Sequence, residues 1–116
     1  FLLTGAGPDT YVEVKSVTLS RAPGIAEFPD SVTARGAKHM AELADMALAG
    51  HRAVIFYLVQ RTDAREVRIA GDIDPVYAAA VRTALAAGVE ALAYACDITP
   101  CGVTLGTRLP FTPPGP

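Results

Sequence analysis

The sequence contains few cysteines, no surplus of positive charge and no long apolar run, and each shortage excludes a class of protein. Its two cysteines, Cys96 and Cys101, are too few for a disulfide scaffold. Their C-x4-C spacing without a second pair predicts free thiols rather than a zinc site. A net charge of −2 is not the footprint of a strong nucleic-acid binder. The longest apolar run, residues 53–59, has the length of a buried strand and not of a membrane span.

The N-terminus lacks an initiator methionine and a basic region. Because the chain opens on Phe-Leu-Leu, we expect a piece of a longer cytoplasmic protein without a signal peptide. Gly5, Gly7 and Gly24 lack the strand-loop-helix context of a phosphate-binding loop, and no Ser/His/Asp arrangement stands out. Hydrophobic residues make up 51% of the 116 residues. That share excludes a disordered tail and predicts one globular domain.

The apolar, β-branched composition of several segments predicts strands. These segments are residues 1–4, 11–19, 51–60, 89–98 and 103–109. The first two form a hairpin around a Gly/Pro turn, and residues 51–60 are apolar nearly throughout, as expected for a sheet covered on both faces. With two intervening helices the order is β-β-α-β-α-β-β, which predicts an α/β fold with a mixed central sheet flanked by helices.

Two helices are predicted from capping signals and helical periodicity. Asp30 or Ser31 caps a helix that runs to residue 49, with Gly50 just past its end. Its apolar stripe is Met40, Leu43, Ala44, Ala47 and Leu48. Asp74 caps the second helix, with Pro75 at its first position and Gly88 past its end. Loops are expected at 21–29 and 61–72, and a loose Pro-rich tail at 110–116.

The stretch YVEVKSVTL at 11–19 places Glu13 and Lys15 two residues apart in a strand. Alternation along a strand puts both side chains on one face, roughly 7 Å apart. Such a pair suits metal-assisted phosphodiester cleavage, in which a carboxylate holds Mg²⁺ and a lysine stabilises the attacking hydroxide and the phosphorane charge. The same alternation is typical of an ordinary half-exposed strand, so spacing alone leaves both interpretations open.

A magnesium site needs a second acid. Asp9 precedes Glu13 by four residues, about 13 Å along an extended chain, so it is interpreted as a turn residue. If Thr4 pairs with Tyr11 in the hairpin, Leu2 faces Glu13 and the residue before Phe1 faces Lys15.

Longer blocks of the sequence carry a more specific signal. They are YVEVKSVTL, FPDSVTARGAKHMAEL at 28–43, HRAVIFYLVQR at 51–61, DIDPVYAAAVRTALAAGVEALAY at 72–94 and the final LPF. In this order they resemble the C-terminal part of the sugar fermentation stimulation protein family, from Phe1 to about Phe111.

The resemblance implies a restriction-endonuclease-like core of the PD-(D/E)xK type over residues 1–111, followed by a flexible tail at 112–116. It implies that the N-terminal OB-like domain of the family is absent from this chain. It also implies a DNA-binding protein with a proposed Mg²⁺- or Mn²⁺-dependent nuclease activity on DNA or RNA. Glu13 matches the family's metal-binding glutamate and Lys15 its catalytic lysine. The family's first metal-binding aspartate directly precedes the match to Phe1.

Further residues of the family block have both ordinary and functional interpretations. Asp30 is either a helix cap or a residue that contacts the metal ion through a water molecule. Arg35, Lys38 and His39 form either a solvated helix face or a phosphate-binding surface for nucleic acid.

The sequence departs from the family pattern at two positions. Ala34 stands where the family usually has glutamate, and Asp72 where many members have histidine. Both departures weaken the expectation of full catalysis. Because the family's first metal-binding aspartate precedes the match to Phe1, we expect this chain to bind Mg²⁺ weakly and to cleave little. The alternative function is a non-catalytic DNA-binding regulator of sugar-metabolism genes.

Overall fold

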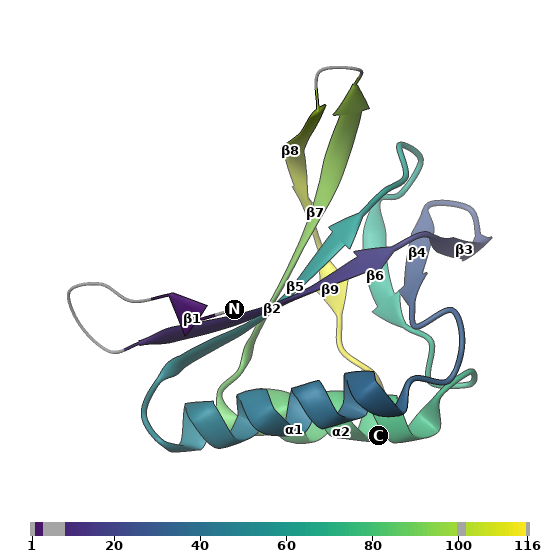
Figure 1. Cartoon of the computed structure of the whole chain (residues 1–116). Helices are drawn as coiled ribbons and strands as arrows, with labels where there is room; N and C mark the ends of the chain where they lie inside the picture. Colours follow the sequence, from purple (N-terminus) through teal and green to yellow (C-terminus); the bar gives the residue numbers. More distant parts are fainter. Residues whose placement is uncertain (1, 4–8, 100–101, 116) are drawn as a thin grey trace.

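The main sheet of the protein contains three parallel strands between two antiparallel ones. The computed structural model describes residues 2–3, 9–99 and 102–115, with side chains for 9–96 and 106–115. Within these residues the sheet has the order β1-β2-β5-β7-β8. Its strands are β1 (Leu2–Leu3), β2 (Thr10–Val17), β5 (Arg52–Val59), β7 (Glu90–Thr99) and β8 (Gly102–Leu109). Strands β2, β5 and β7 run parallel (Figure 1), which confirms the predicted mixed sheet.

A second, smaller sheet was not predicted. Its order is β3-β4-β6-β9. Its strands are β3 (Leu19–Ala22), β4 (Ile25–Phe28), β6 (Glu66–Ile69) and β9 (Phe111–Thr112). The predicted loops at 21–29 and 61–72 are therefore wrong in part, because each contains a strand. Four-residue strands among charged residues are too short to give a clear period-2 signal, although Ala26 and Val67 are fully buried.

The predicted strand at 11–19 is in fact two strands in different sheets. Strand β2 ends at Val17 and β3 begins at Leu19. The amide of Gln60 donates to the carbonyl of Val17 at 2.9 Å, and this bond closes the β2–β5 ladder at the point where the chain leaves the main sheet. Thr18 lies between the two strands and allows the chain to change direction.

Helix α1 (Ala34–Leu48) begins later than predicted. Its N-cap is Thr33, whose side chain accepts a hydrogen bond from the amide of Gly36 at 2.9 Å. The prediction of Asp30 or Ser31 as the cap is wrong, because both precede the helix by several residues and are exposed. The predicted end is confirmed, since Gly50 follows the C-cap Ala49 with φ +93°.

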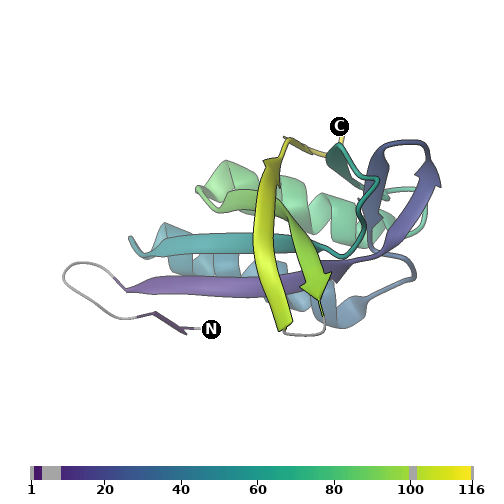
Figure 2. The same cartoon turned by 90° about the horizontal axis from the view of Figure 1, so that it is seen from above.

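Helix α2 (Pro75–Ala87) has the predicted ends. Asp74 is its N-cap, Pro75 its first residue and Gly88 its left-handed C-cap with φ +107°. Both helices lie on the same side of the main sheet (Figure 2). No helix among the described residues is long and apolar enough to cross a membrane.

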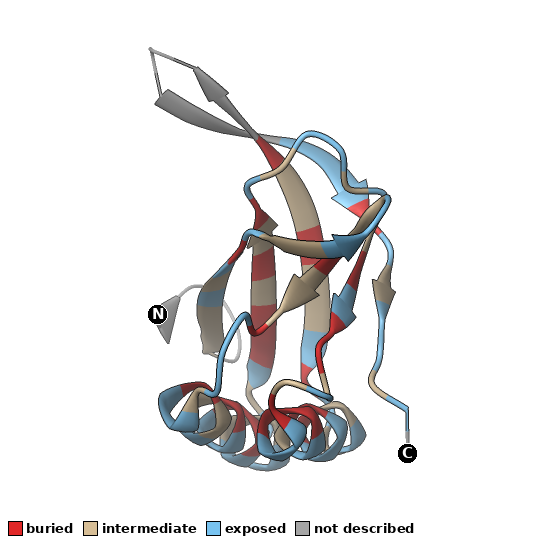
Figure 3. Ribbon diagram, turned by 90° about the vertical axis from the view of Figure 1, so that its right-hand side faces the viewer, coloured by how far each residue is buried: buried red, intermediate tan, exposed pale blue. Residues whose placement is uncertain are grey.

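The hydrophobic core lies between the main sheet and the two helices, as the buried residues in Figure 3 show. Alternate residues of β5 are at most 1% exposed on this inner face: Ala53, Ile55, Tyr57 and Val59. Met40, Leu43 and Ala44 of α1 pack against them, as the predicted stripe requires. Leu48 does not join this stripe, because it ends the helix and is 73% exposed.

The C-terminal segment also has partners. Strand β9 pairs in parallel with β6, and the ring of Phe111 stacks on Tyr57 at 5.3 Å. Arg82 of α2 donates a hydrogen bond to the carbonyl of Gly115 at 2.7 Å. The segment expected to be a loose tail thus contacts both the second sheet and α2.

Candidate active site

The E-x-K pair lies where strand β2 faces helix α1. Glu13 and Lys15 share one face of β2, with Lys15 Nζ 3.4 Å from Glu13 Oε1. Their side chains are only 28% and 14% exposed, respectively. The structure therefore confirms that these two side chains lie side by side. It places them over the edge of the core rather than on a fully solvated strand face.

His39 of α1 completes a three-residue cluster with this pair. Its Nδ1 atom lies 3.2 Å from Glu13 Oε1 and 3.0 Å from Lys15 Nζ. When Nδ1 carries no proton it accepts a hydrogen bond from Lys15, and when protonated it donates to Glu13. Sequence reasoning grouped His39 with Arg35 and Lys38 as a nucleic-acid contact. The structure instead brings its ring directly to the E-x-K pair.

Beside the cluster is a hollow of about 190 Å³ between β2 and α1. Glu13, His39 and Glu42 line it together with apolar residues, which are Tyr11, Val12, Leu43 and Met46. Sequence reasoning gave Glu42 no role. The signal for its position is the i, i+3 spacing from His39, which puts both on one side of α1.

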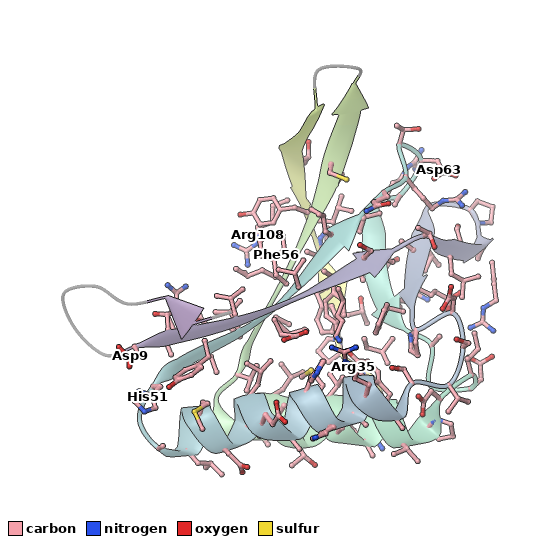
Figure 4. All side chains as sticks on the ribbon, in the orientation of Figure 1. Asp9, Arg35, His51, Phe56, Asp63 and Arg108 are labelled. Atoms are coloured by element: carbon pink, nitrogen blue, oxygen red, sulfur yellow. The ribbon has the colours of Figure 1, made fainter. Side chains whose placement is uncertain are left out.

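Arg35 and Lys38 are exposed residues of the same helix. Arg35 lies one turn before His39, and Figure 4 shows its side chain directed towards the sheet. Asp30 is also exposed and lies outside the helix, close to Ser31, whose hydroxyl is 3.5 Å from its carboxylate.

The described residues contain no group of three His, Cys, Asp or Glu side chains arranged to hold a metal ion. Glu13 supplies one carboxylate, and its close neighbours in the cluster are a lysine and a histidine. Asp9 directly precedes β2, and its carbonyl accepts a hydrogen bond from the amide of Arg52. A hard divalent cation at Glu13 therefore needs at least one further acid.

The register of β1 bears on where that acid can come from. Leu2 pairs with Tyr11 and Leu3 with Thr10, so the predicted pairing of Thr4 with Tyr11 is wrong by two residues. Thr4 itself and the turn at 5–8 lie outside the described residues. A shift of two residues equals one full strand period. Extended by two pairs beyond the described residues, this register would set the position before Phe1 opposite Glu13 and not opposite Lys15.

Two buried tyrosines lie behind the cluster. Tyr57 is the register partner of Lys15, and its hydroxyl is 2.7 Å from that of Tyr77 on α2. Burial raises the pKa of Tyr57 well above its usual value. Burial also raises the pKa of Tyr77, and the negative charges of Asp74 and Glu13 raise it further. Both hydroxyls therefore stay neutral. Sequence reasoning missed this pair, because Tyr57 looked like one member of an apolar run.

The two positions that depart from the family pattern are not members of the three-residue cluster. Ala34 is the exposed first residue of α1. Asp72 forms two hydrogen bonds with Arg21, at 2.7 and 2.8 Å, and Arg21 also pairs with Glu27. The Arg21 guanidinium lowers the pKa of Asp72 to about 2. Asp72 thus serves as an ion-pair partner between β3 and the loop before α2.

Cys96 is a free, buried thiol whose Sγ donates to the carbonyl of Val59 at 3.2 Å. This agrees with the prediction of a free thiol at that position. Cys101 lies outside the described residues.

Comparisons with known proteins identify a family and a related fold. Residues 1–102 match the family model described as the sugar fermentation stimulation protein RE domain. Over 112 residues the chain is 64% identical to the sugar fermentation stimulation protein homolog of Roseobacter denitrificans, covering 96% of this chain and 48% of that protein. A homolog from Ruegeria sp. strain TM1040 is 66% identical over 111 residues, covering 95% and 48%. The chain therefore spans about half the length of these relatives.

A solved structure has the same fold. The structure of Pyrococcus furiosus SfsA in complex with Ca²⁺ superimposes with a TM-score of 0.87 at 28% sequence identity. The match covers 96% of this chain and 48% of that one.

Proposed function

Because the chain belongs to the sugar fermentation stimulation protein family, we propose that it is the nuclease-like half of a metal-dependent phosphodiesterase acting on DNA or RNA. The observation that carries this proposal is the contact between Glu13 and Lys15, 3.4 Å apart on one face of a strand that borders a hollow. A fold of the restriction-endonuclease, PD-(D/E)xK type is part of the same proposal. It accords with an E-x-K strand inside a mixed sheet beside a helix.

Each residue of the cluster has a distinct task in this reaction. Mg²⁺ or Mn²⁺ supplies Lewis acidity and a bound water when present. Glu13 offers a charged oxygen ligand from a fixed strand position. Lys15, held within the cluster by Glu13 and His39, orients the attacking water and stabilises charge that develops on the phosphate. His39 is placed to hold both side chains in these positions.

The metal fits this chain only in part. Glu13 is a suitable ligand. Among the described residues, however, it does not belong to any group of three His, Cys, Asp or Glu side chains that could hold a metal ion. If the β1 register is extended by two pairs, the position before Phe1, where the family resemblance expects an aspartate, would face Glu13. The related Pyrococcus protein was solved with Ca²⁺, a hard cation that prefers oxygen ligands as Mg²⁺ does. We therefore infer weak Mg²⁺ binding by this chain and tighter binding by a full-length protein with both acids.

Arg35 and Lys38 are the proposed phosphate contacts, since both are exposed on the helix that carries His39. The proposal places the protein in the cytoplasm with its nucleic-acid substrate. A second candidate is a non-catalytic DNA-binding regulator of sugar-metabolism genes. This candidate is favoured because Lys15 and His39 both contact the carboxylate oxygen of Glu13 that a metal ion would need.

The test compares three variants of a full-length protein that contains this chain. Glu13→Gln removes a charged ligand and should weaken both metal binding and cleavage. Lys15→Met should leave metal binding intact and reduce the cleavage rate by about 10²–10³, as expected for loss of a preorganised charge. Glu90→Gln is the matched control, because Glu90 is an exposed acid paired with Arg52 on another part of the sheet.

Cleavage is measured on plasmid and single-stranded substrates in Mg²⁺ and Mn²⁺, beside calorimetric metal titration. Unchanged cleavage by the Glu13→Gln variant would assign the activity to another group. A full-length protein that binds DNA normally but cuts neither substrate would leave the regulator as the function.

A further inference from the structure

The main sheet has a second, apolar face on the side away from the helices. The register sets Val14, Phe56 and Leu92 in one row across β2, β5 and β7. The next row contains Leu58 and Tyr94, and the rings of Phe56 and Tyr94 stack at 5.3 Å with an interplanar angle of 2°. We call these five residues the outer face. In Figure 4, Phe56 and Arg108 lie on this side of the sheet.

The outer face is incompletely covered. Val14 is 38% exposed, and Phe56, Leu58, Leu92 and Tyr94 are half-buried. Both helices lie behind the sheet when it is viewed from above, with the strands in front (Figure 2). By contrast, the inner-face residues of β5 are at most 1% exposed.

Such a face conflicts with the usual construction of parallel sheets. Parallel strands are normally covered on both faces, and their sequences are then apolar throughout instead of alternating. Strand β5, RAVIFYLV, has that sequence and lies between two parallel neighbours. Strand β5 therefore has the composition of a strand that is buried on both faces. Within the described residues, helices pack on only one of these faces.

The rim of the outer face resembles that of a protein interface. Arg52 pairs with Glu90 at 2.6 Å at one end, and Gln60 donates to the hydroxyl of Ser16 at 3.2 Å near the other. An apolar centre with a polar rim is typical of protein contacts. The Arg52–Glu90 pair is neutral overall, and Arg108, the register partner of Tyr94, adds one exposed positive charge on this side. A single charge gives the face little of the basic character that binding to a phosphate backbone requires.

The length of the related proteins points to the occupant. This chain spans 48% of the Roseobacter denitrificans relative and 48% of the Pyrococcus furiosus chain, so about half of each protein lies elsewhere. A segment tethered to the sheet has a high effective concentration and needs little intrinsic affinity to cover it. We propose that the outer face is the docking surface for the remaining half of the full-length protein.

Carbene footprinting, which labels exposed side chains of any type, tests this proposal on intact proteins. The chain and the full-length Roseobacter denitrificans relative are labelled in parallel. Peptides from β2, β5 and β7 should be labelled several-fold less in the full-length relative than in this chain. The peptide that contains Val76, an α2 residue that is 69% exposed, serves as the control and should label alike in both. Equal labelling of the strand peptides in the two proteins would overturn the proposal.

Two additions to the same experiment distinguish other occupants. If labelling of the strand peptides in this chain falls as its own concentration rises, a second copy covers the face and the proposal is wrong. If labelling falls when a single-stranded oligonucleotide is added, the face binds nucleic acid and the proposal is equally wrong. Labelling that is unaffected by either addition, together with protection in the full-length relative, supports docking of the remaining half.

A substitution gives an independent readout. Val14→Lys should change the thermal midpoint of this chain little, because Val14 is already partly exposed. At the aligned position of the full-length relative the same change would bury a charge and lower the midpoint by about 5 °C. Val76→Lys is the matched control and should leave both midpoints unchanged. A full-length relative that tolerates lysine at the position of Val14 as well as at that of Val76 would contradict the proposal.

Discussion

The hydroxyl groups of Tyr57 and Tyr77 are each other's partners in a buried environment. They lie 2.7 Å apart, and both tyrosines are fully buried. Tyr57 also packs against Phe28 and Phe111, and Tyr77 against Phe28. A single hydrogen bond thus joins β5 to α2 inside an aromatic cluster, directly behind Lys15.

We predict that Tyr57→Phe and Tyr77→Phe each destabilise the protein by about 1–2 kcal/mol, because each leaves one buried hydroxyl without a partner. The double variant should lose less than the sum of the two, since both polar groups are then gone. Urea unfolding of the four proteins measures the coupling. Additive losses would show that the two hydroxyls do not depend on each other.

At the scale of elements, Asp74 joins the N-termini of the two helices. Its carboxylate accepts hydrogen bonds from the amide of Tyr77 at 3.0 Å and from the amide of Thr33 at 2.8 Å. Thr33 is in turn the N-cap of α1. One buried side chain, 2% exposed, therefore caps α2 and fixes the start of the helix that carries His39.

We predict that Asp74→Ala lowers the free energy of unfolding by about 3 kcal/mol, because it removes a cap and leaves a second buried amide unpaired. Asp74→Asn should cost less, since its carbonyl oxygen still accepts from Tyr77 while its amide faces Thr33. Urea unfolding compares both with Asp45→Ala, the same change at an exposed position of α1. A loss from Asp74→Ala no larger than that of the control would contradict the bridging role.

The same contacts predict a pH dependence. Hydrogen bonds from the amides of Thr33 and Tyr77 lower the pKa of Asp74 below its ordinary value of 3.8. Since the charged form is favoured in the folded state, the stabilisation is fully present above pH 3.8 and is lost as the pH falls through the lower, folded pKa. Stability measured from neutral pH down into this range should fall less steeply in the Asp74→Ala variant. An unchanged slope would show that Asp74 is not a source of acid sensitivity.

At the scale of the whole molecule, ion pairs engage several of the positive side chains that could otherwise contact nucleic acid. The net charge is −2. Several arginines are engaged with carboxylates, namely Arg21, Arg52, Arg61 and Arg68. Lys15 is 14% exposed beside Glu13. Arg35 and Lys38 on α1 are therefore the proposed phosphate contacts near the candidate site.

We predict weak, salt-sensitive DNA binding by this chain, with a slope of log K against log salt of about −2 for two phosphate contacts. Arg35→Ala and Lys38→Ala should each reduce that slope by about 1. Arg68→Ala, which removes an arginine already paired with Glu66, is the control and should leave the slope unchanged. Filter binding at several salt concentrations measures all four proteins. Tight binding that ignores salt would refute this assignment.

Features that depend on local patterns could be predicted from the amino-acid sequence. Period-2 alternation placed Glu13 and Lys15 on one face, and the ends of α2 followed from Asp74, Pro75 and Gly88. The apolar run at 51–60 predicted a strand, which is β5 in the middle of the main sheet. These features are readable because each is set by residues within a few positions of one another.

Contacts between residues that are distant in the sequence became known from the folded structure alone. His39 contacts Glu13, which is 26 positions earlier in the sequence. Tyr77 of helix α2 forms a hydrogen bond with Tyr57 of strand β5. The break between β2 and β3 lies where the amide of Gln60 donates to the carbonyl of Val17, a contact that no pattern within residues 11–19 reveals. The N-cap of α1 is Thr33 and not the predicted Asp30 or Ser31, because the amide of Thr33 donates a hydrogen bond to Asp74, the N-cap of α2. Such contacts are selected by packing between elements, and a local pattern carries no information about them.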